Sequence, residues 1–120
     1  MKTKTKKLEK EFFYEMMLFI VTVAVVAHFY RNNFLLTILL ILLWGISIIW
    51  WHTKRDAKLF ITGAIFGTAI EIICTHFGVW QYGNPTFLNV PVWLPMDWGV
   101  FIVMIVRAAD TLEGIWRALK

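Results

Sequence analysis

The sequence predicts an all-α integral membrane protein, a four-helix bundle with an irregular loop between its third and fourth helices. Hydrophobic residues make up 59% of the 120 residues and charged residues only 17%. This balance is too apolar for a water-soluble fold of this length. The apolar residues also fall into four runs that short polar segments separate. Length and composition together indicate a single transmembrane domain, residues 1–120.

The first two predicted transmembrane helices cover residues 12–30 and 34–51. Residues 1–11 are polar and basic without helical periodicity, which predicts a solvated tail. At 1.5 Å per residue the first run rises about 28 Å, close to the thickness of the hydrocarbon core. Acidic residues before and inside this run are atypical of a signal peptide, so we expect a retained helix. A tight turn at residues 31–33 leads to the second run, which is rich in Leu and Ile.

The third and fourth predicted helices cover residues 59–79 and 96–116. A short charged loop, residues 52–58, precedes the third helix. The segment between the two helices is rich in Gly, Pro, Trp and Tyr and contains no Lys or Arg. Pro95 stands where a helix can begin, because its missing N–H would have no helical partner there.

The distribution of basic residues predicts the orientation of these helices. Of the twelve Lys and Arg residues, only Arg31 falls on the side opposite the two termini. The positive-inside rule therefore places both termini and residues 52–58 in the cytoplasm, and residues 80–94 outside. We expect a multi-pass protein of the inner (cytoplasmic) membrane. The basic residues lie in short runs between apolar segments, which indicates membrane orientation and no nucleic-acid partner.

A carboxylate interrupts the third apolar run. At 100° per residue, Glu71 shares one stripe with the small residues Gly63, Gly67, Thr75 and Gly78. Small residues let a neighbouring helix approach closely, so we expect Glu71 to point into the bundle. The Gly63/Gly67 stripe is also a candidate contact for a second copy of the chain or a partner membrane protein. Glu71 is then either a buried structural carboxylate or a general acid held in a dry pocket.

A second carboxylate, Asp97, lies in the first turn of the fourth predicted helix. The helix dipole favours an anion there, so capping alone explains this residue. The functional interpretation is that Asp97 and Glu71 face one outward-opening pocket as an acid/base pair. These two residues are the candidate catalytic groups.

Aromatic residues gather at the predicted outer boundary. They indicate either an aromatic belt at the headgroups or the lining of a site for an elongated apolar ligand.

Arg107 is a further candidate, and its partner is either Glu71, at a similar depth, or Asp110, one helical turn on. The full set of candidate ligand-binding residues is Thr75, His76, Trp80, Tyr82, Trp93, Trp98 and Arg107.

No spacing in the sequence demands a metal or a cofactor. His76 lies about 140° from Glu71 on its helix, so the two do not face one centre without a kink. His28 lies at a similar depth on the first helix, but two histidines and a carboxylate do not by themselves define a site. Walker, CxxC, HExxH and serine-nucleophile motifs are missing from the sequence. Cys74, within an apolar helix, lacks the setting of a reactive thiol.

The order Gly67…Glu71…Thr75…Gly78…Tyr82…Val90-Pro91…Trp98 resembles the core motif of the carotenoid hydratase family of integral membrane enzymes, which take part in carotenoid biosynthesis. In that motif a helix with a glutamate leads into a Gly-x-Tyr loop and a Val-Pro turn before a tryptophan. The resemblance covers about a third of the chain. It implies an isoprenoid substrate and addition of water across a carbon–carbon double bond. It also implies that Glu71 is an acid or base and that Tyr82 and Trp98 belong to the pocket.

Three functional hypotheses follow. The first is an enzyme that performs hydration or proton-transfer chemistry on a hydrophobic lipid of the isoprenoid or carotenoid type. The second is a non-catalytic membrane subunit or assembly factor that binds a partner through the glycine stripe. The third is a small proton-coupled transporter, because a deep carboxylate is a minimal requirement for one.

Overall fold

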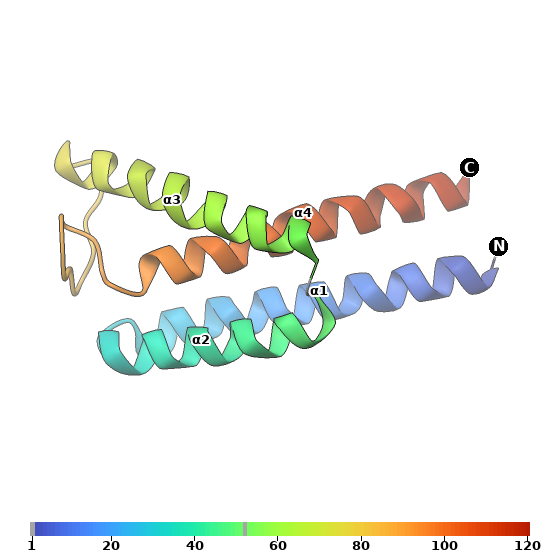
Figure 1. Ribbon diagram of the computed structural model, residues 1–120, viewed down its shortest axis with the longest axis horizontal. Helices are drawn as coiled ribbons and strands as arrows, with labels where there is room; N and C mark the ends of the chain where they lie inside the picture. The colour runs from blue at the N-terminus through green and yellow to red at the C-terminus, as the bar shows by residue number, and fades with distance from the viewer. Residues whose placement is uncertain (1, 52) are drawn as a thin grey trace.

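The computed structural model describes residues 2–51 and 53–120, apart from the side chain of Trp50. Within this part of the chain there are four helices: α1 (Lys2–Phe29), α2 (Asn33–Trp50), α3 (Lys54–His76) and α4 (Leu94–Leu119) (Figure 1). The described residues form no β-strand, only an isolated bridge between Phe87 and Val90. The expected all-α, four-helix architecture is confirmed.

Figure 1 also shows that both termini lie at one end of the molecule, called here the terminal end. The loop between α3 and α4, residues 77–93, lies at the opposite end, called here the loop end. The turn between α1 and α2 lies at the loop end as well.

α1 begins far earlier than expected: residues 2–11 belong to this helix, although most of them are exposed, as the predicted solvated tail requires. Lys and Glu are good helix formers, and a periodic apolar face is not needed for them to extend a helix. α4 supports the extension, because Leu8 packs close to Gly114: a Cβ atom on that glycine would lie 3.3 Å from Cδ1 of Leu8.

The predicted charged loop at residues 52–58 is largely wrong, because α3 begins at Lys54. Thr53 is its N-cap and forms a capping box with Asp56, and two backbone N–H groups are thereby satisfied. At its other end α3 stops at His76, and the chain reverses at Gly78, whose φ of +75° lies in the left-handed region.

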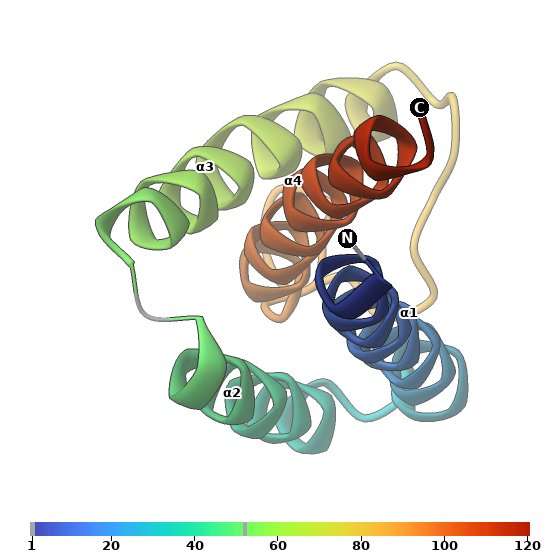
Figure 2. The ribbon, with the colours of Figure 1, turned by 90° about the vertical axis from the view of Figure 1, so that its right-hand side faces the viewer.

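α4 is the central helix of the bundle. It packs against α3 on one side and α1 on the other, while α2 packs against α1 and more lightly against α4 (Figure 2). The glycines of α3 allow the close approach of α4: a Cβ atom on Gly63 would lie 2.6 Å from Cγ1 of Ile102, and one on Gly67 would overlap the Trp98 indole. The Gly63/Gly67 stripe, a candidate contact for a second protein, therefore packs against α4 of the same chain.

The loop is pinned to the α1–α2 turn by side-chain hydrogen bonds. The Asn84 amide donates to the backbone carbonyls of Tyr30 and Arg31, and the Asn33 amide donates to the Asn84 carbonyl at 2.9 Å. Trp93 donates from Nε1 to Oδ1 of Asn33 at 3.2 Å. The loop is thus a fixed cover over the loop end of the bundle.

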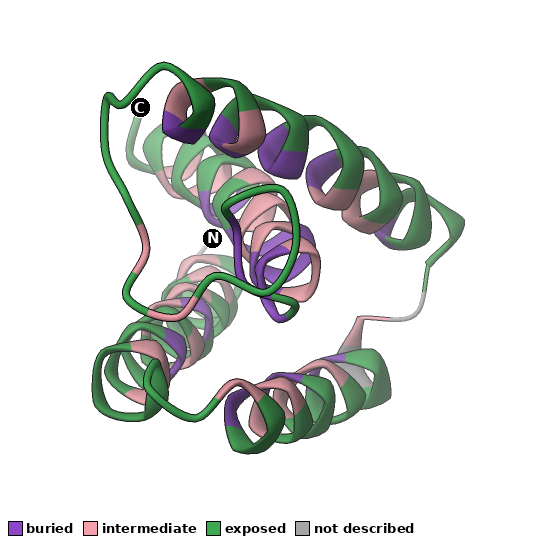
Figure 3. Cartoon of the chain, turned by 90° about the vertical axis from the view of Figure 1, so that its left-hand side faces the viewer, coloured by how far each residue is buried: buried purple, intermediate pink, exposed green. Residues whose placement is uncertain are grey.

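Exposed residues cover the outer faces of the helices, and buried residues lie on the faces between them (Figure 3). The buried residues include an apolar core, with Leu36, Leu40 and Val100 among its members. Large apolar side chains point outward, among them Phe34 and Phe77, which are 78% and 76% exposed. Polar side chains are buried between the helices: Glu15, Thr22, Ser47, Asp56, Thr68, Glu71, Thr75, Asp97 and Thr111. Within the described residues, two helices, α1 and α3, are long and apolar enough to cross a membrane, and α2 is a shorter apolar helix.

Candidate functional site

Glu71 lies on the face of α3 that meets the rest of the bundle, as predicted, and is only 9% exposed. The chain reversal at Gly78 brings Trp80 back over the end of this helix. The indole Nε1 of Trp80 donates a 2.6 Å hydrogen bond to Oε2 of Glu71. A carboxylate removed from water needs such a donor to offset its lost hydration.

Tyr82 comes from the same loop and lies beside Glu71. Its phenol is half-buried. Burial first, and then the neighbouring Glu71, raise the pKa of the Tyr82 phenol above its ordinary value. Tyr82 is therefore neutral throughout the physiological range.

Asp97 lies in the first turn of α4, within electrostatic reach of Glu71. It is 7% exposed, and its Oδ1 has no hydrogen-bond partner among the described residues. Two buried carboxyl groups therefore lie near each other at the loop end: Glu71 accepts a hydrogen bond from Trp80, and Asp97 has an unpartnered oxygen.

Other predicted residues frame this pair. The Trp98 indole lies against Gly67, one helical turn before Glu71 on α3. Thr75 is buried one turn after Glu71, and its hydroxyl donates to the Ile72 carbonyl at 3.1 Å. Trp93 is also buried, and its ring contacts Tyr82 edge-on with centroids 6.1 Å apart.

A cavity of about 220 Å³ lies beside this cluster at the loop end. Tyr82 and Trp93 line it together with Tyr30, Asn84 and residues of α1. Neither Glu71 nor Asp97 lines this cavity. Tyr82 lines it and also lies beside Glu71.

His76 does not join the cluster. Its side chain is exposed and packs edge-on against the Phe77 ring. His28 is exposed as well, with Nδ1 2.9 Å from the Ala24 carbonyl. Among the described residues, no group of three or more His, Cys, Asp or Glu side chains is arranged to hold a metal ion.

Arg107 is not part of this cluster either, and both partners expected for it are wrong. Its Nε and Nη2 bind the two carboxylate oxygens of Asp56 at 2.9 and 2.5 Å, toward the terminal end. Asp110 instead pairs with Arg55 at 2.7 Å. α3 and α4 run antiparallel, so a residue well along α4 faces the first turn of α3 and lies far from Glu71.

No protein-family model, curated protein or solved structure matches the chain. The resemblance to carotenoid hydratases therefore stays a prediction, and it depends on the residues quoted for it.

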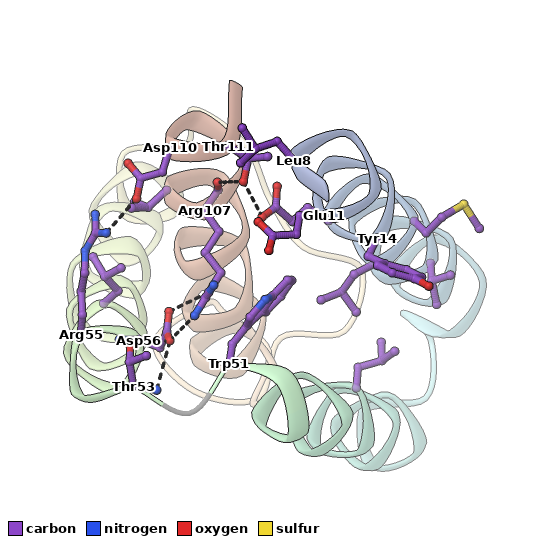
Figure 4. A pocket seen from close by; sticks show the side chains of 17 residues that line it. Leu8, Glu11, Tyr14, Trp51, Thr53, Arg55, Asp56, Arg107, Asp110 and Thr111 are labelled. Atoms are coloured by element: carbon purple, nitrogen blue, oxygen red, sulfur yellow. Dashed lines mark hydrogen bonds and ion pairs between the residues drawn. The ribbon is translucent and has the colours of Figure 1, made fainter. Parts of the chain in front are cut away.

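A much larger cavity, missed from the sequence, lies toward the terminal end. It measures about 900 Å³ and is lined by α1, α2, the start of α3 and α4 (Figure 4). Glu15, Trp51 and Asp56 line it. A usable signal was present: Glu15 is an ionisable residue within the predicted first span, the same feature that singled out Glu71.

Proposed function

We propose that the chain is an integral membrane protein whose four helices cross the bilayer with both termini in the cytoplasm. The many exposed large apolar side chains support this, because an apolar surface of this extent is costly in water and stable in lipid. The Lys and Arg residues support the orientation, because all but Arg31 belong to the terminal end or the start of α3 and the inner part of α4.

We further propose that the loop end carries acid–base chemistry on a hydrophobic isoprenoid or carotenoid-type lipid. The single observation behind this proposal is the pair of buried carboxyl groups, Glu71 and Asp97, beneath the indole and phenol of Trp80 and Tyr82. Ionisable groups at this depth are costly and are usually functional. The buried Oδ1 of Asp97 has no partner among the described residues, so it is available to a water molecule or a substrate.

The hydrogen bonds suggest a division of roles. The Trp80 indole holds the carboxyl group of Glu71 beside the Tyr82 phenol, and we assign Glu71 the role of general base. Asp97, whose Oδ1 has no partner among the described residues, is the general acid and supplies the proton. In a hydration, Asp97 adds its proton to one alkene carbon, and water attacks the carbocation at the other. Glu71 then takes the proton that this water loses, so the product is an alcohol.

The neighbouring residues fit the same reaction. The aromatic faces of Trp98 and Trp80 can stabilise a carbocation through their π systems. The cavity of about 220 Å³ is large enough for water, and Tyr82, which lines it, lies beside Glu71. That volume is too small for a whole carotenoid, and neither carboxyl group lines it, so we assign this cavity to water and place the lipid outside it, among the acyl chains.

The test is expression of the wild type and of Glu71→Gln and Asp97→Asn in a host that makes polyprenyl lipids, followed by mass spectrometry of lipid extracts. We expect the wild type to produce a lipid heavier by one water, and both variants to lose it. Glu113→Gln, an exposed carboxylate on α4, is the matched control and should retain it. A hydrated product made equally by wild type and Glu71→Gln would refute the acid–base proposal.

A further inference from the structure

The large cavity toward the terminal end has the size of a small-molecule site. Its volume of about 900 Å³ lies at the upper end of the range for such sites, roughly 300–1,000 Å³. Figure 4 shows Arg107 reaching from α4 to Asp56, with Trp51 between them and α1. The cavity is separate from the Glu71 cluster, since the two sets of lining residues share no member.

The charge of the lining is negative. Four carboxylates and two guanidinium groups contribute to it, namely Glu11, Glu15, Asp56, Asp110, Arg55 and Arg107. Each guanidinium is already engaged: Arg107 with Asp56 at 2.5 Å and Arg55 with Asp110 at 2.7 Å. Neither glutamate has a Lys or Arg within ion-pair distance in the described part of the chain.

Glu15 is the buried member of this set. It is 2% exposed, and its Oε1 accepts a 2.9 Å hydrogen bond from the Thr111 hydroxyl. Its Oε2 is buried and has no partner among the described residues. A buried carboxylate oxygen without a donor carries a large desolvation cost. A positively charged ligand in the adjoining cavity would offset that cost.

The rest of the wall is apolar and aromatic. Leu18, Val21, Leu43 and Val106 line it, and Tyr14 and Trp51 contribute rings. The Arg107 guanidinium already lies over the Trp51 ring, 4.8 Å from its centroid, which shows that this surface accommodates a cation. A ligand that suits both parts of the wall has an apolar body and one positive charge.

We propose that this cavity binds an amphiphilic organic cation, with Glu15 as its counter-ion and the apolar wall around its body. The proposal does not depend on Glu71 or on chemistry at the loop end. An anionic lipid headgroup is the competing ligand, but it would have to draw Arg55 or Arg107 from carboxylates that already bind them.

The deciding experiment uses two probe ions of the same shape and opposite charge, tetraphenylphosphonium and tetraphenylborate. Binding of each to the full chain in nanodiscs is measured by equilibrium dialysis, and binding to empty nanodiscs is subtracted. We expect saturable binding of tetraphenylphosphonium with a Kd at least about tenfold lower than that of tetraphenylborate. No binding, equal binding, or a preference for tetraphenylborate would overturn the proposal.

Variants locate the site. Glu15→Gln should weaken tetraphenylphosphonium binding by about tenfold or more, and Glu9→Gln, an exposed carboxylate on the same helix, should leave it unchanged. Leu43→Trp keeps Glu15 but narrows the cavity, so it should also weaken tetraphenylphosphonium binding. This variant replaces Glu15→Gln as the test if Glu15→Gln does not fold. Unchanged binding in Glu15→Gln, or in Leu43→Trp, would overturn the assignment. Glu71→Gln should bind normally, which separates this proposal from the lipid chemistry above.

Discussion

The indole of Trp80 donates a 2.6 Å hydrogen bond to the carboxylate of Glu71, nine residues earlier in the chain. The link requires the reversal at Gly78, whose positive φ few other residues adopt without strain. It ties the loop to the buried carboxylate, so the loop positions Glu71 as well as covering it.

Replacement of Trp80 by Phe should therefore destabilise the protein while it keeps most of the aromatic contact. A buried carboxylate would lose one donor, which corresponds to about 1–2 kcal/mol in the free energy of unfolding. Thermal unfolding in detergent measures the change. Trp116→Phe, at an exposed position on α4, is the control and should leave the midpoint unchanged. Equal effects of both substitutions would show that the hydrogen bond contributes nothing.

Gly67→Ala should lower stability because the new methyl group would overlap the Trp98 indole. Overpacking of this kind costs about 1–3 kcal/mol. Gly45→Ala is the matched control, since nothing lies within 4 Å of its added Cβ atom. That control should be neutral or stabilise by up to about 1 kcal/mol, because alanine favours helix more than glycine does. Denaturant titration in the same detergent gives the free energy of unfolding of each variant. If Gly67→Ala is as stable as Gly45→Ala, the close contact of α3 with α4 is contradicted.

The pair formed by Asp56 and Arg107 should show a measurable coupling energy. Asp56 is buried and Arg107 partly exposed, so we expect about 1–2 kcal/mol from a double-mutant cycle of Asp56→Asn and Arg107→Gln. The exposed pair of Glu113 and Arg117, one helical turn apart on α4, should give only about 0.3–0.5 kcal/mol in a parallel cycle. Similar coupling energies for the two pairs would argue against a buried bridge between α3 and α4.

Tyr82 should be the last tyrosine to ionise in an alkaline titration, because burial and the neighbouring Glu71 raise its pKa. The folded state then retains a proton that the unfolded state has released. Tyr82 thus contributes stability that is fully present below pH of about 10, its unfolded pKa, and is lost as pH rises toward the folded pKa. Phenolate absorbance follows ionisation, and the latest step should be missing in Tyr82→Phe. If that variant keeps the step, another tyrosine is responsible for it.

Two separate lines of reasoning lead to the site at the loop end. One is the resemblance to carotenoid hydratases and the other is the geometry of the loop end, and they share several residues. The resemblance concerns the order of Glu71, Tyr82 and Trp98 along the chain. The structure adds that Tyr82 lies beside Glu71 and that Trp98 packs against Gly67, one turn before Glu71 on α3. It also removes Arg107 and His76 from the cluster, because one lies with Asp56 and the other faces outward.

Local patterns in the sequence were sufficient for the number of helices, the inward face of α3 and the irregular loop after it. Each of these depends on the length of an apolar run, on helical periodicity or on residues that break a helix, and all three are local properties.

Contacts between helices decided the remaining features. Leu8 of α1 packs against Gly114 of α4, and this contact lies in the part of α1 that extends back to Lys2. The antiparallel register of α3 and α4 pairs Arg107 with Asp56, and the looser packing of α2 leaves the cavity beside Glu15. Register and spacing between helices are set by which side chains fit together across the bundle, and that fit is not encoded within any single helix.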